Sequence, residues 1–178
     1  MFKLEFRSNV MSNIEIQVGD ITTADTDAIV NAANPKMLGG GGVDGAIHKA
    51  AGPKLLEECR KVKSVNGIRC PFGESRITPA CNLRSKFVIH TVGPIYRNEK
   101  DPPSVLRSAY KSACELAIRN GCKSIAFPAI SCGAYGYPHE EAAKIAVEVC
   151  CKYSQLKVTF YLFDRPLFEV FRKAQSGT

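Results

Sequence analysis

The sequence predicts a three-layer α/β domain, in which helices cover both faces of a central sheet. Short segments rich in β-branched residues alternate along the chain with longer segments of helical period. Two of the short segments, FVIHTV and SIAFPAI, are apolar nearly throughout, and helices usually cover both faces of such strands. The 178 residues suit one domain with a sizeable core. Ligands of open α/β sheets bind beyond the carboxyl ends of the strands, so chemistry is expected there.

Six segments have the composition of strands, and one of them is short and weak. The five stronger segments span residues 14–18, 28–32, 87–92, 124–130 and 157–163, and the weak one spans residues 76–79. The first ten residues, MFKLEFRSNV, alternate apolar and polar side chains as an edge strand does. Met11 is an alternative initiator that would make them dispensable. We therefore expect residues 1–12 to be an extension or an edge strand and residues 13–175 to form one domain.

Five segments have the period of amphipathic helices. They span residues 43–50, 54–63, 104–120, 139–153 and 166–174. Ser104 offers only a partial N-cap, because Arg107 stands where a capping box has Glu. Gly121 suits the end of the third helix, and Pro138 suits the first position of the fourth.

The charge balance indicates an anionic partner. The formal net charge is +7 and the isoelectric point is about 9.0, which suits nucleic acid or a phosphate-bearing ligand as well as an ordinary basic surface. The basic residues are spread along the chain without a run of five, which argues against a dedicated nucleic-acid arm. Nucleic acid therefore stays open as a partner but is not required.

The eight cysteines do not indicate a metal site or a disulfide framework. Only Cys150 and Cys151 are close in sequence, no CxxC pair occurs, and no histidine stands at ligand spacing from a cysteine. We expect mostly buried, reduced thiols in a cytoplasmic protein. No stretch approaches the roughly 20 apolar residues that span a bilayer, and the charged N-terminus is unlike a signal peptide. A monomer is expected.

A run of four glycines, Gly39 to Gly42, lies between a strand and a helix in the stretch NAANPKMLGGGGVDG. Glycines let backbone N–H groups approach an anion, and a helix N-terminus adds favourable dipole charge. The spacing does not fit a dinucleotide-binding fingerprint, because NPKML separates the strand from the glycines. Taken alone, the run is more simply a flexible loop with Asp44 as a helix N-cap.

A second glycine loop favours anion binding over the interpretation as a flexible loop. Residues 128–138 read PAISCGAYGYP and again lie between a strand and a helix. Two such loops at one edge of the sheet could hold a diphosphate from both sides. Tyr135 could add an aromatic wall for a sugar or base, although ordinary loop packing also explains Tyr135 and Tyr137.

Three isolated residues each allow two interpretations, and a fourth, His90, allows one. Asp20 ends the first strand, where it could accept a hydrogen bond from an exocyclic amine such as that of adenine, or simply cap a turn. Phe163 could stack on a base, although a core aromatic is the simpler interpretation. His90 is most simply a core histidine. His48 shares a helix face with Asp44 and either tunes that carboxylate or packs beneath the loop.

Six motifs, in order, resemble the macrodomain family: GDIT, IVNAAN, GGGGVDGAIHKAAG, IHTVGP, FPAISCGAYGYP and LFD. The four glycines followed by Val-Asp-Gly are most similar to its MacroD-type ADP-ribosyl hydrolase branch. The likeness runs from about Ile14 to Phe168. It implies a three-layer α/β/α fold with a mixed sheet of about six strands. It also implies a cleft for ADP-ribose, with no cofactor and no metal.

The resemblance also implies roles for individual residues. Asp20 would accept from the adenine amine with Ile21 beside it, while Phe163 would lie near adenine with Asp164 as its polar neighbour. Asn34 and Asp44 would be the catalytic pair. The further binding residues implied are Asn31, Gly40, Gly41, Gly42, Val43, Ser131, Cys132, Gly133, Ala134, Tyr135 and Gly136.

The implied activity is ester hydrolysis. The substrates would be proteins carrying mono-ADP-ribose on acidic side chains, O-acetyl-ADP-ribose, or both. A carboxylate is a good leaving group, so a positioned water would suffice. Asp44 would orient or deprotonate this water, Asn34 would fix the ribose hydroxyls, and Tyr135 would hold the distal ribose. Two alternatives stay open: an ADP-ribose reader without hydrolysis, and a regulator associated with RNA or poly(ADP-ribose) whose binding falls steeply with salt.

Overall fold

The computed structural model describes residues 12–177, so the extension or edge strand expected at residues 1–12 lies almost wholly outside the described residues. Within residues 12–177 the chain forms six strands, five α-helices and one short 3-10 helix. The strands are β1 (Ile14–Val18), β2 (Ala28–Ala32), β3 (Ser75–Pro79), β4 (Phe87–Thr91), β5 (Ser124–Phe127) and β6 (Lys157–Leu162). The helices are α1 (Gly42–Ala51), α2 (Lys54–Lys61), α3 (Pro102–Arg119), α4 (His139–Cys150) and α5 (Arg165–Ser176), and the 3-10 helix is η1 (Ile21–Thr23).

The strands form a mixed sheet with the order β1-β6-β5-β2-β4-β3. Only β3 runs antiparallel to its neighbour among the strand pairs described. The carboxyl ends of the five parallel strands therefore meet at one edge of the sheet. The loops that follow β1, β2, β4, β5 and β6 all begin at this edge.

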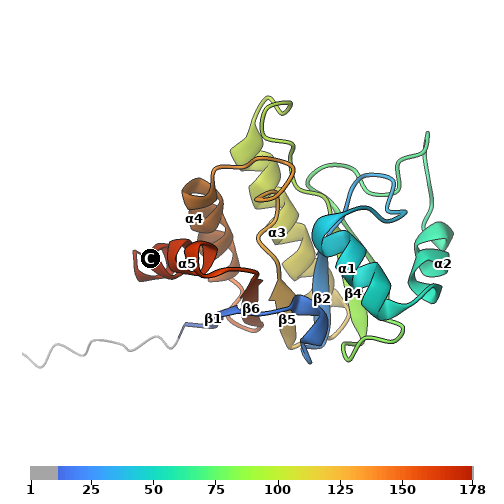
Figure 1. Cartoon of the computed structure of the whole chain (residues 1–178), viewed down its shortest axis with the longest axis horizontal. Helices are drawn as coiled ribbons and strands as arrows, with labels where there is room; N and C mark the ends of the chain where they lie inside the picture. Colours follow the sequence, from blue (N-terminus) through green and yellow to red (C-terminus); the bar gives the residue numbers. More distant parts are fainter. Residues whose placement is uncertain (1–11, 178) are drawn as a thin grey trace, which may run out of the picture.

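Helices cover both faces of the sheet (Figure 1). On one face, Ile47 of α1 and Leu55 of α2 belong to the same buried cluster as Ile29 of β2. On the other face, α3, α4 and α5 enclose an aromatic cluster whose members are Tyr110, Phe127, Phe160 and Phe171. The expected three-layer α/β/α fold with a mixed sheet of six strands is confirmed.

Some element boundaries differ from those that the sequence predicts. The strand expected at residues 124–130 ends at Phe127, because Pro128 has no N–H group to continue the ladder. The cap expected at Ser104 is wrong, since α3 begins at Pro102 and the Asp101 side chain accepts from the Ser104 amide at 3.3 Å. The 3-10 helix η1 has no counterpart in the sequence-based prediction.

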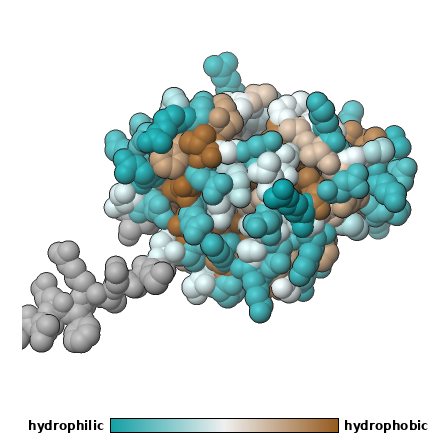
Figure 2. All heavy atoms as spheres, turned by 60° about the horizontal axis from the view of Figure 1, so that its bottom comes forward, coloured by the Kyte–Doolittle hydropathy of each residue, from teal (hydrophilic) through white to brown (hydrophobic). Residues whose placement is uncertain are grey.

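The surface shown in Figure 2 is dominated by hydrophilic side chains, with hydrophobic side chains in separate areas between them. Along residues 12–177, no helix combines the length and the apolarity that crossing a bilayer requires. Six cysteines are buried, Cys81 is partly exposed and Cys151 is exposed, and all eight are free thiols.

Candidate functional site

A cleft of about 790 Å³ opens at the carboxyl edge of the sheet. Its volume lies in the range of sites that enclose a small organic ligand. It is lined by segments that follow β1, β2, β4, β5 and β6. Of the residues that the sequence singled out, it brings together Asp20, Ile21, Asn34, Gly40, Gly41, Gly42, Val43, Asp44, Ser131, Cys132, Gly133, Ala134, Tyr135 and Phe163.

The first glycine loop presents a row of unpaired backbone amides to this cleft. Within the described residues, the N–H groups from Gly40 to Asp44 have no hydrogen-bond acceptor. Gly41 and Gly42 border open space, since a Cβ on either would meet no atom within 4 Å. Because α1 begins at Gly42, its dipole adds to these amides. The loop is therefore suited to bind an anion.

Asn34 holds the shape of this loop. Its Oδ1 accepts from the Lys36 amide at 3.2 Å and from the Met37 amide at 3.3 Å, and its Nδ2 donates to the Gly39 carbonyl at 3.1 Å. The loop is also closed by tight packing, because a Cβ on Gly45 would lie 2.8 Å from the Gly40 carbonyl oxygen. The glycine that ends the Val-Asp-Gly sequence therefore has a steric reason.

Asp44 lies in the first turn of α1 and is only 4% exposed. Its Oδ1 accepts from Nδ2 of Asn31 at 2.7 Å and lies 3.4 Å from Nε2 of His48. Burial raises the pKa of Asp44, while the Asn31 hydrogen bond and nearby His48 act in the opposite direction. Its other oxygen lies against Gly40, where a Cβ would come within 3.0 Å of Oδ2. The alternative interpretation of Asp44 as a helix N-cap is wrong, since Gly41 is the cap residue of α1.

The second glycine loop faces the same cleft with a second set of amides. Among residues 12–177, no acceptor pairs with the N–H groups of Gly133, Ala134 and Tyr135. Ser131 adopts a left-handed backbone with a φ of 64°, which is strained for a residue with a side chain. Its hydroxyl donates to the Pro94 carbonyl at 2.8 Å, and its own carbonyl accepts from the Tyr137 amide at 2.9 Å. These bonds hold the strained turn in place.

The aromatic and acidic residues of the cleft are placed as follows. Tyr135 lines the cleft, and its pKa is raised first by burial and then by the nearby Asp44 carboxylate. Phe163 is 76% exposed, so the core interpretation is wrong for it. Asp20 caps η1, because its Oδ1 accepts from the amide and the hydroxyl of Thr22 at 2.9 and 2.7 Å. Its Oδ2 has no partner among the described residues and is free for a ligand.

Three of the implied site residues do not line the cleft. Asn31 is fully buried behind Asp44. Asp164 caps α5 through a 2.9 Å bond from the Leu167 amide. Gly136 lies just beyond the lining residues, with a φ of 68° that favours glycine. These positions can act on a ligand only through their neighbours or after movement.

The sequence model of the Macro domain matches residues 30–146 of this chain. A macro domain-containing protein of Vibrio parahaemolyticus is 57% identical over 166 residues, which cover 92% of this chain and 98% of that protein. The chain belongs to the macrodomain family. This confirms the resemblance to the macrodomain family that the six sequence motifs indicated.

The names of other proteins similar to this macrodomain state an activity or a bound ligand. A protein of Enterobacter cloacae named O-acetyl-ADP-ribose deacetylase is 49% identical over 166 residues, covering 90% of this chain and 92% of its own. The macrodomain of Oceanobacillus iheyensis with ADP superposes with a TM-score of 0.88 at 44% identity, covering 92% of this chain and 90% of its own. The Trypanosoma brucei macrodomain in complex with ADP-ribose superposes with a TM-score of 0.82 at 40% identity, covering 90% of this chain and 68% of its own.

The macrodomain cleft also has a lining that the sequence did not single out. These further residues are Gly19, Ala32, Ala33, Ala46, Gly93, Pro128, Ala129, Ile130, Tyr161, Leu162 and Leu167. Gly93 is the most constrained, because a Cβ there would overlap Ser131 Oγ and Ile130 Cγ2. The signal available was a glycine directly before Pro94 at the end of an apolar strand. It indicated a turn but not the close approach of a second loop.

Burial argues against cysteine chemistry in this macrodomain cleft. Cys132 lines it, yet burial raises the pKa of its thiol to about 12, so the nucleophilic thiolate is not formed near neutral pH. Among residues 12–177, no three His, Cys, Asp or Glu side chains are grouped as metal ligands.

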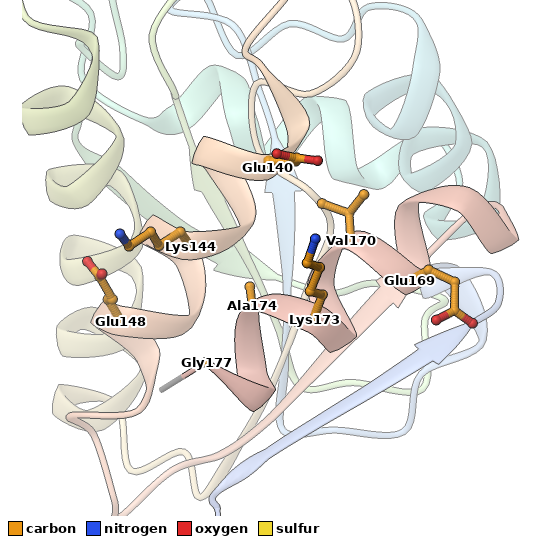
Figure 3. Close-up of a pocket in the computed structure, with 8 residues that line it drawn as sticks. All are labelled: Glu140, Lys144, Glu148, Glu169, Val170, Lys173, Ala174 and Gly177. Atoms are coloured by element: carbon orange, nitrogen blue, oxygen red, sulfur yellow. The ribbon is translucent and has the colours of Figure 1, made fainter.

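A second hollow of about 460 Å³ lies between α4 and α5 (Figure 3). Its charged lining residues are of both signs: Glu140, Lys144, Glu148, Glu169 and Lys173. A lining with more carboxylates than ammonium groups does not favour a polyanionic ligand. The site of the macrodomain is therefore assigned to the larger cleft.

Proposed function

We propose that this macrodomain binds ADP-ribose in the cleft and hydrolyses carboxylic esters of its distal ribose. The substrates are O-acetyl-ADP-ribose and proteins that carry mono-ADP-ribose on acidic side chains. The observation that carries the proposal is the meeting of two sets of unpaired amides, from Gly40–Asp44 and from Gly133–Tyr135, in one cleft beside a buried carboxylate. The relatives named O-acetyl-ADP-ribose deacetylase support the same activity.

The amides suit the diphosphate of ADP-ribose. Each phosphate carries negative charge, which N–H groups and the N-terminus of α1 can stabilise without a metal ion. One set of amides comes from each side of the cleft, so a two-phosphate group can be held between them. The basic net charge of +7 favours the approach of such an anion.

The end of the cleft near β1 and β6 suits adenine. The unpaired Oδ2 of Asp20 can accept a hydrogen bond from the exocyclic amine, and the exposed ring of Phe163 can lie against the base. This arrangement leaves the distal ribose at the other end, between Asn34 and Tyr135. Asp164 supports the adenine end only indirectly, by capping α5 directly after Phe163.

Asp44 supplies the base for hydrolysis. A water held between the first glycine loop and the nearer phosphate attacks the ester, and Asp44 orients it or accepts its proton. Burial raises the pKa of Asp44, which makes the carboxylate a stronger base than one in water. The departing carboxylate needs no strong general acid. Most of the rate then comes from positioning by Asn34 and Tyr135, and from the loop amides that stabilise developing charge.

A reader module without hydrolysis would bind ADP-ribose through the same amides. It would not need a buried carboxylate at the distal ribose, and this is the observation that favours hydrolysis. A regulator that binds RNA or poly(ADP-ribose) by charge would bind outside the cleft as well. Its affinity would then fall steeply as salt is raised.

The experiment that tests the proposal follows the release of product over time. The purified chain is incubated with O-acetyl-ADP-ribose and, separately, with a protein labelled with mono-ADP-ribose on glutamate. We expect release of acetate from the first and of labelled ADP-ribose from the second, both lost in Asp44→Ala. Tight binding of ADP-ribose without release from either substrate would instead establish a reader.

A further inference from the structure

A line of buried polar side chains runs from Asp44 across the sheet beneath α1. Nδ2 of Asn31 donates to Asp44 Oδ1 at 2.7 Å and lies 3.3 Å from Nδ1 of His90. On the far side of the same ring, Nε2 of His90 lies 2.9 Å from the Thr78 hydroxyl. The four side chains are buried, and Asn31 and His90 are fully so. None but Asp44 lines the cleft.

The sheet register places these residues together. Asn31 of β2 pairs with His90 of β4, so both side chains point to the same face. Thr78 of the neighbouring strand β3 lies diagonally from His90 on this face. The face is the one that α1 and α2 cover, and there Asn31 meets the first turn of α1.

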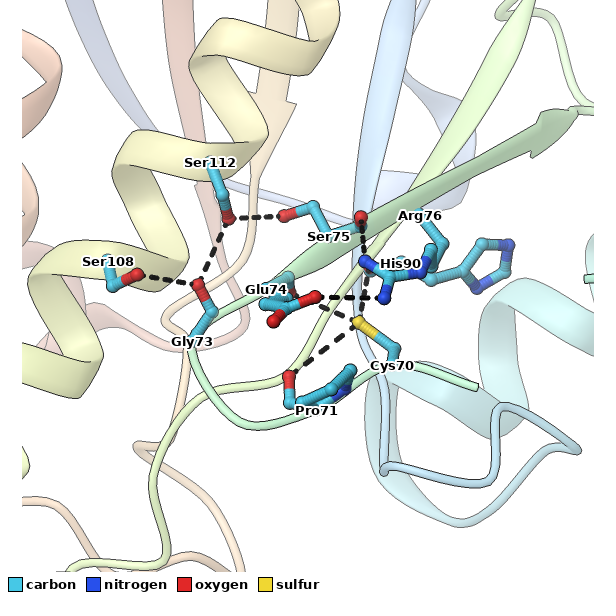
Figure 4. Close-up of polar contacts among 9 residues, drawn as sticks. All are labelled: Cys70, Pro71, Gly73, Glu74, Ser75, Arg76, His90, Ser108 and Ser112. Atoms are coloured by element: carbon cyan, nitrogen blue, oxygen red, sulfur yellow. Dashed lines mark hydrogen bonds and ion pairs between the residues drawn. The ribbon is translucent and has the colours of Figure 1, made fainter. Parts of the chain in front are cut away.

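The segment of residues 70–76 helps to hold the backbone of His90 in place. The thiol of Cys70 donates to the His90 carbonyl at 3.7 Å and also to the Glu74 carbonyl at 3.2 Å. Figure 4 shows these contacts, with the imidazole ring of His90 pointing away from Glu74 and Ser75. The backbone that carries the His90 ring is therefore held in place by these hydrogen bonds.

The contacts determine which nitrogen of His90 carries the proton. Asn31 has two N–H hydrogens on Nδ2, and the one not used by Asp44 faces His90 Nδ1. That nitrogen must be unprotonated to accept it, so Nε2 carries the proton and donates to Thr78. The thiol of Cys59 lies farther from Nε2, at 3.7 Å. Burial, and secondly the nearby His48, lower the pKa of His90 to about 3, so the ring stays neutral at physiological pH.

The oxygen of the Asn31 amide does not help to fix its orientation. Oδ1 of Asn31 is buried and has no hydrogen-bond partner among the described residues. The amide is therefore oriented only from its nitrogen side, by Asp44 and His90. Once Asp44 has taken a proton, a turned amide could accept from the protonated carboxyl, and His90 is then the remaining group that opposes the turn.

We propose that His90 is a positioning residue for hydrolysis: its unprotonated Nδ1 holds the Asn31 amide so that an N–H group faces Asp44. This inference rests on the proposed function, because the orientation matters for turnover only if Asp44 acts on the water. Through Asn31, His90 fixes the direction of the Asp44 carboxylate and opposes its retention of a proton. It touches neither substrate nor water.

Two substitutions of His90 separate positioning from packing. His90→Asn keeps an acceptor at the place of Nδ1, because both atoms are bonded to Cγ. His90→Gln keeps only the group at the place of Nε2. Both side chains are smaller than that of histidine, and Asn is the smaller of the two, so the loss of packing should be at least as large in His90→Asn as in His90→Gln. We expect His90→Asn to retain most of the turnover and His90→Gln to lose about tenfold in kcat, with little change in KM.

The carboxylate pKa gives a readout that does not depend on turnover. In a carbon-13 NMR titration, Asp44 should titrate at higher pH in His90→Gln than in the wild type, and near the wild-type value in His90→Asn. The other titratable groups facing Asp44 and His90 are His48, Cys59, Cys70 and Tyr135, and all are unchanged in both variants. Equal loss of kcat in the two variants, or an unshifted Asp44 in His90→Gln, would overturn the proposal.

The wild-type protein supplies a test that needs no variant. Nitrogen-15 NMR should show a neutral His90 ring with the proton on Nε2 from about pH 5 to about pH 8, the range in which an ordinary histidine titrates. A proton on Nδ1 would overturn the proposal, because Asn31 could not then donate to it. If the wild type hydrolyses neither ester, the proposed function fails, while the tautomer and the Asp44 pKa still decide whether His90 orients Asn31.

Discussion

The side-chain amide of Asn31 donates a 2.7 Å hydrogen bond to Asp44, which joins the middle of the sheet to the first turn of α1. This bond favours the ionised carboxylate, but burial outweighs it and raises the pKa of Asp44. The folded protein therefore binds the Asp44 proton more tightly than the unfolded chain does. Ionisation of Asp44 therefore lowers the free energy of unfolding, as is common for groups that are retained for function.

This balance predicts how Asp44 affects stability at different pH. With a raised pKa, its contribution to the free energy of unfolding is fully present below the usual carboxylate range. It is lost as the pH rises through the raised pKa. Asp44→Asn should therefore be more stable than the wild type at neutral pH, with the difference vanishing in acid. Urea denaturation over a pH series measures this, and lower stability of the variant throughout would contradict it.

The same substitution should nearly abolish turnover. Asp44→Asn keeps the size of the side chain but cannot accept a proton from water, so kcat should fall by about 100-fold or more. Calorimetric titration should show ADP-ribose binding close to that of the wild type. Lys49→Ala, an exposed change on the same helix, serves as the control. Wild-type turnover in Asp44→Asn would remove this residue from the mechanism.

Gly41→Val should block the ligand without disturbing the fold. Gly41 has a φ of −93°, which suits any residue, and a Cβ there would meet no protein atom within 4 Å. The side chain would border the space proposed for the diphosphate, so ADP-ribose affinity should fall by about tenfold or more. Ala50→Val, farther along α1, is the matched control. Unchanged affinity in Gly41→Val would argue against an anion at this loop.

Gly93→Ala should destabilise the protein, because the new methyl group would overlap Ser131 Oγ and Ile130 Cγ2. Overpacking of this kind costs about 1–3 kcal/mol in the free energy of unfolding. Gly133→Ala is the control, since a Cβ at Gly133 meets nothing within 4 Å. Removing the hydroxyl and the strained turn with Ser131→Gly should restore part of the loss. Equal stability of the two alanine variants would show that the two loops are not interlocked.

Salt dependence separates cleft binding from general attraction to polyanions. A ligand with one diphosphate in the cleft should lose little affinity between low and moderate salt. A regulator that binds nucleic acid through many phosphate contacts should lose several orders of magnitude. Titrations of ADP-ribose and of a short single-stranded RNA at two salt concentrations measure both. A steep decrease for ADP-ribose itself would favour the regulator.

Local sequence was enough to predict the two glycine loops and the layers of the fold. The glycines, the apolar strands and the order of elements are properties of short segments, so the strands near β2 and β5 could be placed before the loops. Asp20 shows a limit of this reasoning. Its turn-capping role and its ligand role were treated as alternatives, whereas its two oxygens can serve both.

Contacts that depend on strand register could not be predicted. The link from Asn31 to His90 exists because β2 and β4 pair in one register, and a single sequence does not give that register. Gly93 was missed for a similar reason, since its constraint comes from Ser131 on another loop. The core was the simpler interpretation of Phe163 because aromatic residues usually lie there, whereas the family resemblance implied a place near adenine, and the exposure of Phe163 follows from its position just after β6.

The central claim is that the amides of both glycine loops hold one diphosphate. The most direct measurement is a titration of the nitrogen-15 labelled protein with ADP-ribose, followed by the backbone amide signals. The account predicts that the signals of residues 40–44 and 133–135 shift together along one binding curve. Shifts confined to one loop, or absent from both while ADP-ribose binds elsewhere, would contradict it.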